Sequence, residues 1–273
     1  MEVRKIADFD IALRVAVAAD DVAAHGHAIA EMLWPAASRA VDVLRDDLAA
    51  LYAADGRAVA RALTADGRAA VEAKGLGGDL PTGLAEVYGA CGKEADADSR
   101  VGDVKVDVPP PCALRDARLV ELGAGVGLTG LTCASQVGAA LLTDGDERSV
   151  ALLEENVARN AAKLASGTCL VASLKWDDEA DIGAALARLG RQGGHVDIVL
   201  GSDLVYFRHL AKPLWRTAKA LLGPGGRFIY AHTRRCEMME DKFLRASSAH
   251  GFVLADVRIV SADVNIYVFV RTQ

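Results

Sequence analysis

The chain has 273 residues and a formal net charge of −6, with 52% hydrophobic and 25% charged residues. This is the composition of a globular protein with a substantial core, organised as one large domain or two small ones. The acidic balance disfavours a nucleic-acid backbone as the main partner, because neutralising phosphates requires a basic face. No apolar run approaches the ~20 residues that a membrane span needs, so we expect no membrane partner either.

The cysteines and the first residues of the sequence indicate a compartment. The cysteines are Cys91, Cys112, Cys133, Cys169 and Cys236. They are odd in number, scattered and never in C-x-x-C spacing, which argues against a disulfide framework or a metal site and fits a reducing compartment. The opening MEVRKIADFD contains acids and no apolar segment of the signal-peptide type. We therefore expect a cytoplasmic protein, with the nucleus as the alternative.

Residues 1–52 are predicted to form a strand and a helix that pack on the core as an N-terminal extension. IALRVAV at 11–17 has the pattern of a strand, and 28–51 has helical periodicity. The apolar positions of that periodicity include Leu33, Ala37, Val41, Leu44 and Leu48. Residues 53–113 are rich in alanine, glycine and aspartate and are predicted to be a mobile, partly helical, low-complexity insertion. Translated non-coding sequence is the alternative for that segment.

From 114 to 273, apolar strand-like runs alternate with helical patterns. The strands are expected at 118–122, 139–143, 168–174, 196–201, 226–231, 252–258 and 264–270, and the helices near 127–137, 146–164, 179–190, 207–222 and 237–249. This alternation predicts an α/β fold with an open, doubly wound, mostly parallel sheet. The last two strands are separated only by Ser261–Asp263, too short for a parallel crossover, so the final strand is expected to run antiparallel.

Two local patterns refine these elements. The helix at 146–164 has apolar residues at Val150, Leu153, Val157 and Ala161, spaced 3, 4 and 4, which predicts the face that packs on the sheet. The sequence Gly-Pro-Gly-Gly at 223–226 predicts a helix end followed by a turn.

The stretch LVELGAGVGLTGL at 119–131 indicates a binding site. A short apolar strand leads into a turn with Gly123, Gly125 and Gly127, and an apolar helix follows. Such a turn presents free backbone N–H groups and the positive end of the helix dipole to a ligand, as nucleotide cofactors require. The next strand ends in Asp144, whose carboxylate is placed to accept both ribose hydroxyls.

The glycine spacing separates two cofactor classes. A dinucleotide fingerprint, G-x-G-x-x-G, would place its third glycine at position 128, which is Leu128. The third glycine is instead Gly127, which disfavours a nicotinamide-dependent oxidoreductase.

With this spacing, and with Glu121 two residues before Gly123, the stretch resembles the first motif of seven-strand S-adenosylmethionine-dependent methyltransferases. Four more stretches resemble the non-histone protein-lysine methyltransferases, which include the calmodulin-lysine methyltransferase and enzymes that act on chaperones and elongation factors. They are LWPAA at 33–37, LLTDGDERSVALLEENVARN at 141–160, LKWDDEAD at 174–181 and VDIVLGSDLVYF at 196–207. The resemblance covers about 28–51 and 118–273 and implies a Rossmann-like, seven-stranded fold.

The resemblance also implies how S-adenosylmethionine is held. The backbone of Gly123, Ala124, Gly125 and Gly127 is expected to approach the methionine moiety. Glu121 is expected to receive the amino group of the cofactor, or, in the alternative, only to order the loop. Asp144 would bind the ribose, Trp176 would pack against the adenine, Trp34 would lie over the cofactor, and Ser202 would line the site at the end of the fourth strand. Core packing is the alternative for both tryptophans.

Asp203 and Tyr206 are the predicted catalytic residues. They are spaced i, i+3 and are expected to face the same way on a turn that opens the next helix. Lysine methylation requires a neutral amine, yet at pH 7 only about one free lysine in 2,500 is unprotonated. The site must therefore desolvate and orient the amine, and a carboxylate and a phenol are suitable acceptors for its N–H groups. A capping role for Asp203 and a packing role for Tyr206 are the alternatives.

The sequence therefore predicts an S-adenosylmethionine-dependent N-methyltransferase that acts on a lysine of a protein, as a monomer and without a metal. One alternative is a small-molecule methyltransferase on the same fold, with 53–113 as an enclosing lid. Another is a cofactor-binding interaction protein without activity, which the intact Asp203 and Tyr206 disfavour.

Overall fold

The computed structural model describes residues 2–6, 8–13, 35–54, 110–164, 168–191, 194–234 and 237–272. Several sequence predictions fall outside these ranges. They concern Trp34, residues 14–17 of the predicted N-terminal strand, and residues 55–109 of the predicted insertion.

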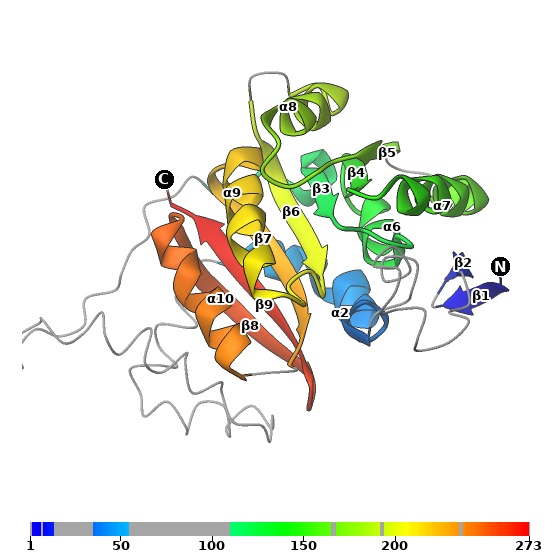
Figure 1. The fold of residues 1–273 in the computed structure, drawn as a ribbon. Coiled ribbons are helices and arrows are strands. Elements are labelled where there is room, and N and C mark those ends of the chain that lie inside the picture. The colour runs from blue at the N-terminus through cyan, green and yellow to red at the C-terminus, as the bar shows by residue number, and fades with distance from the viewer. Residues whose placement is uncertain are drawn as a thin grey trace, which may run out of the picture.

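A seven-stranded sheet forms the centre of the molecule (Figure 1). Its spatial order is β5-β4-β3-β6-β7-β9-β8. The bounds are β3 Arg118–Leu122, β4 Ala139–Asp144, β5 Thr168–Ser173, β6 Val196–Ser202, β7 Leu222–Thr233, β8 Phe252–Ser261 and β9 Val264–Arg271. All neighbouring strands are parallel except where β9 pairs with β7 and β8. The predicted α/β fold with an antiparallel last strand is confirmed.

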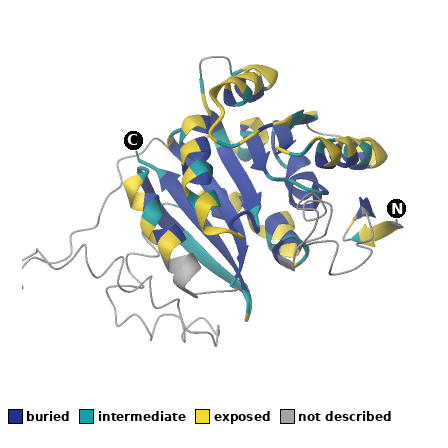
Figure 2. Ribbon diagram, in the orientation of Figure 1, coloured by how far each residue is buried: buried dark blue, intermediate teal, exposed yellow. Residues whose placement is uncertain are grey.

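Helices cover both faces of this sheet. On one face lie α2 Pro35–Tyr52, α6 Leu128–Ala134 and α7 Glu147–Arg159, and on the other lie α8 Glu179–Arg188, α9 Ala211–Leu221 and α10 Glu237–Ala249. Short 3-10 turns are η2 Leu114–Asp116, η3 Ala161–Lys163 and η4 Arg208–Leu210. Successive strand residues point to opposite faces, so Leu119 joins one core cluster and Val120 the other. Burial on both faces explains why the strands read as continuous apolar runs (Figure 2).

The sheet reverses its order between β3 and β6. From β3 the chain proceeds outward to β4 and β5, and it then returns to the other side of β3 to build β6 and β7. In open α/β sheets, ligands bind beyond the carboxyl ends of the strands at such a switch point. The ends of β3, β4 and β6 are therefore where a site is expected.

Two local predictions need correction. The helix end predicted at Gly223–Gly226 is confirmed, since α9 ends at Leu221, but these glycines form an irregularity inside β7 and not a turn before it. The pairing of β7 with β6 shifts between Leu222 and Arg227. Three of the predicted positions of α7 do pack on the core, with Leu153 buried and Val150 and Val157 half-buried, whereas Ala161 is exposed. The fully buried face also includes Ser149, Leu152 and Asn156. Ser149 bonds to the N-cap residue Asp146, and Asn156 turns inward because it bonds to a hairpin that the sequence analysis did not predict.

That hairpin consists of β1 Glu2–Ile6 and β2 Phe9–Leu13, which pair antiparallel as a separate two-stranded sheet. It lies against α7, where Asp10 and Ala12 bond to side chains of that helix. Phe9 and Ile11 are buried with residues of α2 and α6 in one core cluster. No helix in the described part of the chain is both long enough and apolar enough to cross a membrane.

Two helical glycines give a matched test of the packing around α6. An added Cβ at Gly130 would overlap Leu142 Cδ2 and Glu121 Oε2, whereas at Gly183 in α8 it would meet nothing within 4 Å. We expect Gly130→Ala to lower the free energy of unfolding by about 1–3 kcal/mol through overpacking. Gly183→Ala should raise it by up to about 1 kcal/mol, because alanine is the better helix former. Urea denaturation measures both, and a stabilising Gly130→Ala would contradict the packing described.

Candidate active site

The glycine turn joins β3 to α6 at the switch point. Gly123, Gly125 and Gly127 have φ values of 56°, 53° and 85°, a region that side chains with a Cβ disfavour. At Gly123 a Cβ would also lie 2.7 Å from Leu204 Cδ2, so the loop after β6 packs directly on this turn. The N–H of Ala124 donates to Thr143 O at 2.8 Å, which fixes the turn against β4. The turn, residues 123–127, is thus close-packed against β4 and the loop after β6, and it is called the cradle below.

Asp144 links this cradle to the start of α7. Its Oδ2 accepts the N–H of Gly125 and its Oδ1 accepts the N–H of Asp146, both at 3.0 Å. Burial raises the pKa of the carboxyl group above its usual range. Each carboxylate oxygen has a further lone pair beyond these bonds, so the group is still able to accept two hydroxyls. This arrangement fits the predicted ribose contact.

Glu121 does not face the cradle. The side chain is 1% exposed and lies under α6, where Thr129 Oγ1 donates to its Oε1. Burial raises the pKa of this carboxyl group to about 8. The bond to Thr129 is what the alternative in which Glu121 orders the loop requires. Its buried Oε2 has no hydrogen-bond partner among the described residues, and contact with the amino group of a cofactor stays a prediction.

Trp176 and Ser202 lie at the ends of the two strands that flank the site. Trp176 follows β5, and its Cζ2 is 3.4 Å from the position of a Cβ built on Gly123, so the indole lies beside the cradle. Ser202 ends β6, and its buried Oγ has no hydrogen-bond partner among the described residues. A buried hydroxyl without a partner is costly, and a ligand group in the site would satisfy it.

The cradle therefore fits a nucleoside cofactor of the predicted kind. It combines a close backbone approach, an acid with free acceptor capacity, a flat apolar ring and an unsatisfied hydroxyl. These belong to Gly123, Asp144, Trp176 and Ser202. Trp34, the other predicted wall, lies outside the described residues.

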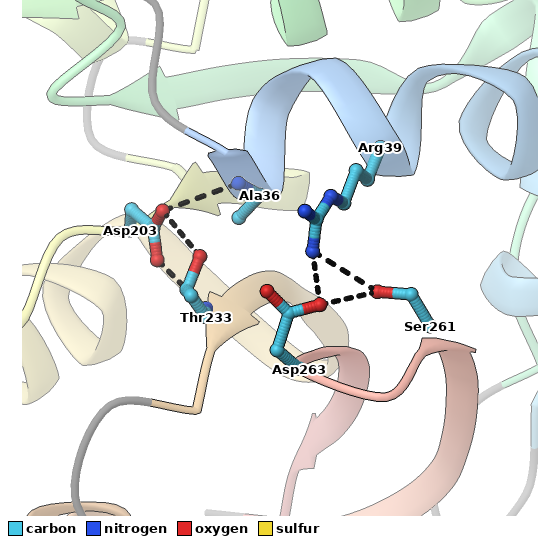
Figure 3. A network of polar contacts seen from close by, with 6 residues as sticks. All are labelled: Ala36, Arg39, Asp203, Thr233, Ser261 and Asp263. Atoms are coloured by element: carbon cyan, nitrogen blue, oxygen red, sulfur yellow. Dashed lines mark hydrogen bonds and ion pairs between the residues drawn. The ribbon is translucent and has the colours of Figure 1, made fainter.

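Asp203 is a buried junction between three elements (Figure 3). It is 3% exposed, and its φ of 53° is positive, a backbone conformation that aspartate tolerates better than most residues. Its carboxylate accepts the N–H and the hydroxyl of Thr233 at the end of β7, both at 2.7 Å. It also accepts the N–H of Ala36 in the first turn of α2, at 3.2 Å. The helix dipole of α2 favours a negative charge at this position.

A second carboxylate holds the same end of α2. Asp263, in the β8–β9 turn, pairs with Arg39, and Ser261 Oγ donates to Asp263 Oδ1 at 2.9 Å (Figure 3). Ala36 and Arg39 lie three positions apart, so the first turn of α2 is held from β6 and from the β8–β9 turn together. This fixes the point at which the chain enters the core from its N-terminal part.

Asp203 and Tyr206 do not share a helical face, which corrects the sequence prediction. Residues 203–207 form a loop, and helical structure begins only at Arg208 in η4. Asp203, Leu204 and Val205 are buried, whereas Tyr206 and Phe207 are 38% and 54% exposed. Of the large hydrophobic side chains in the described residues, Val3 is the other exposed one.

Tyr206 lies two residues after Leu204, whose side chain packs on Gly123 of the glycine turn. Partial burial and the nearby charge of Asp144 raise the pKa of its phenol. Its ring packs edge-on against Phe207, at a centroid distance of 5.0 Å, and Phe207 stacks on His209 at 5.7 Å. The loop thus presents an exposed aromatic surface after the end of β6.

Sequence reasoning missed Thr233 and the N–H of Ala36 as the partners of Asp203. Thr233 ends β7, and β7 lies next to β6, whose end is followed by Asp203. An acid and a hydroxyl at the ends of adjacent strands were therefore a signal from which this contact could have been predicted. The backbone N–H of Ala36 is 167 residues away along the chain and leaves no signal in the sequence.

Comparison with protein families matches residues 105–250, more than half of the chain, to a family described as lysine methyltransferase. The chain belongs to the lysine methyltransferase family. The match spans the glycine turn, Asp144, Trp176, Ser202, Asp203 and Tyr206.

Curated proteins similar to this family member are named as lysine methyltransferases. The EEF1A lysine methyltransferase 3 of Mus musculus is 30% identical over 157 residues, which are 57% of this chain and 61% of the mouse protein. The protein-lysine N-methyltransferase EFM3 of Chaetomium thermophilum is 32% identical over 51% of this chain and 42% of its own length. The calmodulin-lysine N-methyltransferase of Arabidopsis thaliana is 29% identical over 41% and 35%. The chain thus spans between 35% and 61% of these relatives.

The raised pKa of Glu121 makes stability depend on pH. Between its ordinary value of 4.5 and about 8, the unfolded chain releases the proton while the folded chain keeps it, so unfolding becomes easier as pH rises. Glu121→Gln removes this linkage. We therefore expect the free energy of unfolding of the variant, relative to that of the wild type, to rise between pH 5 and pH 8 by on the order of 3 kcal/mol. Urea denaturation at several pH values measures this, and a difference that does not change with pH would contradict it.

Proposed function

We propose that the protein is an S-adenosylmethionine-dependent N-methyltransferase that methylates a lysine side chain of a protein. Membership of the lysine methyltransferase family supports the reaction class, and the names of the relatives support a protein substrate. The observation that carries the proposal is the meeting of the glycine turn, Asp144 and the loop that carries Tyr206 at the switch point of the sheet.

The described residues suit the parts of this cofactor. Asp144 would accept the ribose hydroxyls, and the indole of Trp176 would pack on the adenine. The backbone of Gly123, Ala124 and Gly125 would face the methionine moiety, with Ser202 as a nearby hydroxyl. When bound, the cofactor supplies an electrophilic methyl group on a sulfonium sulfur.

Tyr206 is proposed to receive the substrate amine. A tyrosine phenol is protonated at neutral pH, so its oxygen accepts a hydrogen bond from the amine N–H without carrying a charge. The ring also faces a cation favourably, which suits both the incoming ammonium and the methylated product. Phe207, 54% exposed, offers an apolar surface to the methylene stem of the lysine.

Asp203 acts in this proposal by positioning. Its carboxylate is directed to Thr233 and Ala36, so it fixes the loop from which Tyr206 projects. Direct contact between Asp203 and the substrate amine stays a prediction.

Binding of S-adenosylhomocysteine tests the cofactor assignment. A ligand that binds the folded state must raise the melting temperature, and calorimetry gives its affinity. We expect clear stabilisation of the wild type and at least about tenfold weaker binding by Asp144→Ala, which loses charge-assisted acceptors. The absence of stabilisation at millimolar ligand would contradict the assignment.

Substitution of Tyr206 tests the catalytic assignment. Tyr206→Phe keeps the ring and removes the acceptor, so we expect methyl transfer from labelled cofactor to proteins of a cell lysate to fall by about 10–100-fold. Affinity for S-adenosylhomocysteine should stay within about twofold, because Tyr206 is assigned to the amine. Equal losses of activity and of ligand affinity would overturn this role, and an unchanged rate would as well.

A further inference from the structure

Two buried asparagines on α7 hold the N-terminal hairpin by its backbone. Asn160 accepts the N–H of Asp10 at 2.9 Å and donates to the carbonyl of the same residue at 2.9 Å. Asn156 accepts the N–H of Ala12 at 2.7 Å and donates to its carbonyl at 3.2 Å. Both side chains belong to residues with no exposed surface. Each amide thus pairs with a residue of β2 as the backbone of a neighbouring strand would.

The spacing of the two elements makes this pairing possible. Four residues along a helix advance about 6 Å, and two residues along a strand advance about 6.8 Å. Asn156 and Asn160 are therefore in register with Ala12 and Asp10. A two-stranded hairpin is marginal alone, and its open edge needs partners. The asparagines supply those partners. Docking of the hairpin and the orientation of the two asparagine side chains therefore depend on each other.

The two asparagines differ in where the second N–H of the amide goes. Asn160 Nδ2 donates to the carbonyl of Asn156 within α7, at 2.8 Å. Asn156 Nδ2 donates to the carbonyl of Val126 at 2.9 Å. Val126 lies in the glycine turn, between Gly125 and Gly127. Asn156 therefore bonds to the hairpin and to the cradle with a single planar group.

The bond to Val126 complements the one made by Asp144. The N–H of Gly125 donates to Asp144, and the N–H of Gly127 donates to Ala124 O at 2.8 Å. Asn156 adds a hydrogen bond to the carbonyl oxygen of Val126, in the peptide between Val126 and Gly127. A glycine-rich turn has little intrinsic conformational preference, so these bonds set its shape.

We propose that Asn156 is a positioning residue that couples docking of the β1–β2 hairpin to the affinity of the glycine turn for S-adenosylmethionine. The inference rests on the cofactor assignment of the proposed function. With the hairpin docked, Ala12 holds the amide of Asn156 so that its second N–H meets Val126. With the hairpin released, the amide loses that orientation, and ligand binding must order the turn again. Coupling of this kind is reciprocal, so the ligand in turn stabilises the hairpin.

A double-mutant cycle on S-adenosylhomocysteine affinity tests the coupling. Ile11→Ala loosens the hairpin through a fully buried side chain that carries none of the polar contacts described. We expect it to weaken binding about fivefold, the change that one net hydrogen bond gives. Asn156→Ala should weaken binding by at least as much, and Ile11→Ala should have no further effect in that background. Leu244→Ala in α10, buried on the other face of the sheet, is the control for general loss of stability and should leave the affinity unchanged.

Unchanged affinity for S-adenosylhomocysteine in Ile11→Ala overturns the proposal. A double variant whose loss of affinity equals the product of the two single losses overturns it as well. Should Asn156→Ala not fold, Ile11→Ala alone decides. Hydrogen exchange gives a second readout without ligand: the Gly127 amide should exchange faster in Ile11→Ala than in Leu244→Ala. In the wild type, S-adenosylhomocysteine should slow exchange of the Asp10 and Ala12 amides. A wild type that does not bind the ligand refutes the cofactor assignment, while the Gly127 exchange still reports whether the hairpin and the turn are coupled.

Discussion

The carboxylate of Asp144 holds together the two turns from which the candidate site is built. One oxygen accepts the N–H of Gly125, in the turn after β3, and the other accepts the N–H of Asp146, which caps α7. Together with the bond from Asn156 Nδ2 to Val126 O, this bridge fixes the glycine turn relative to α7. Each oxygen keeps a further lone pair, so in the proposed function the same side chain serves both the scaffold and the binding of a ligand.

Three acids were predicted to line the site, and the structure divides their roles by burial and by partners. Glu121 points under α6 and bonds to Thr129. Asp203 points between β7 and the start of α2 and bonds to Thr233 and Ala36. Asp144 combines burial with direct contact to the cradle. A methyl-transfer site needs a rigid, desolvated pocket more than it needs charges, and two of the three carboxylates serve that rigidity.

The sheet and the location of the site could be predicted from the sequence because both depend on local patterns. Strands buried on both faces are apolar throughout, and glycines and acids at their carboxyl ends mark the switch point. The inward face of α7 could not be predicted, because Asn156 and Asn160 are buried by bonds to residues 144 and 150 positions away. The direction of Asp203 was missed for the same reason: a positive φ in a loop turned it away from the helical geometry that the i, i+3 spacing implied.

The central claim is that this site transfers a methyl group to the side-chain nitrogen of a protein lysine. The most direct measurement is mass spectrometry of lysate proteins after incubation with the enzyme and a cofactor that carries a deuterated methyl group. We expect a deuterated methyl group on the side-chain nitrogen of a lysine in one or a few proteins, absent without the enzyme. Label confined to small molecules, or found on a residue other than lysine, would contradict it.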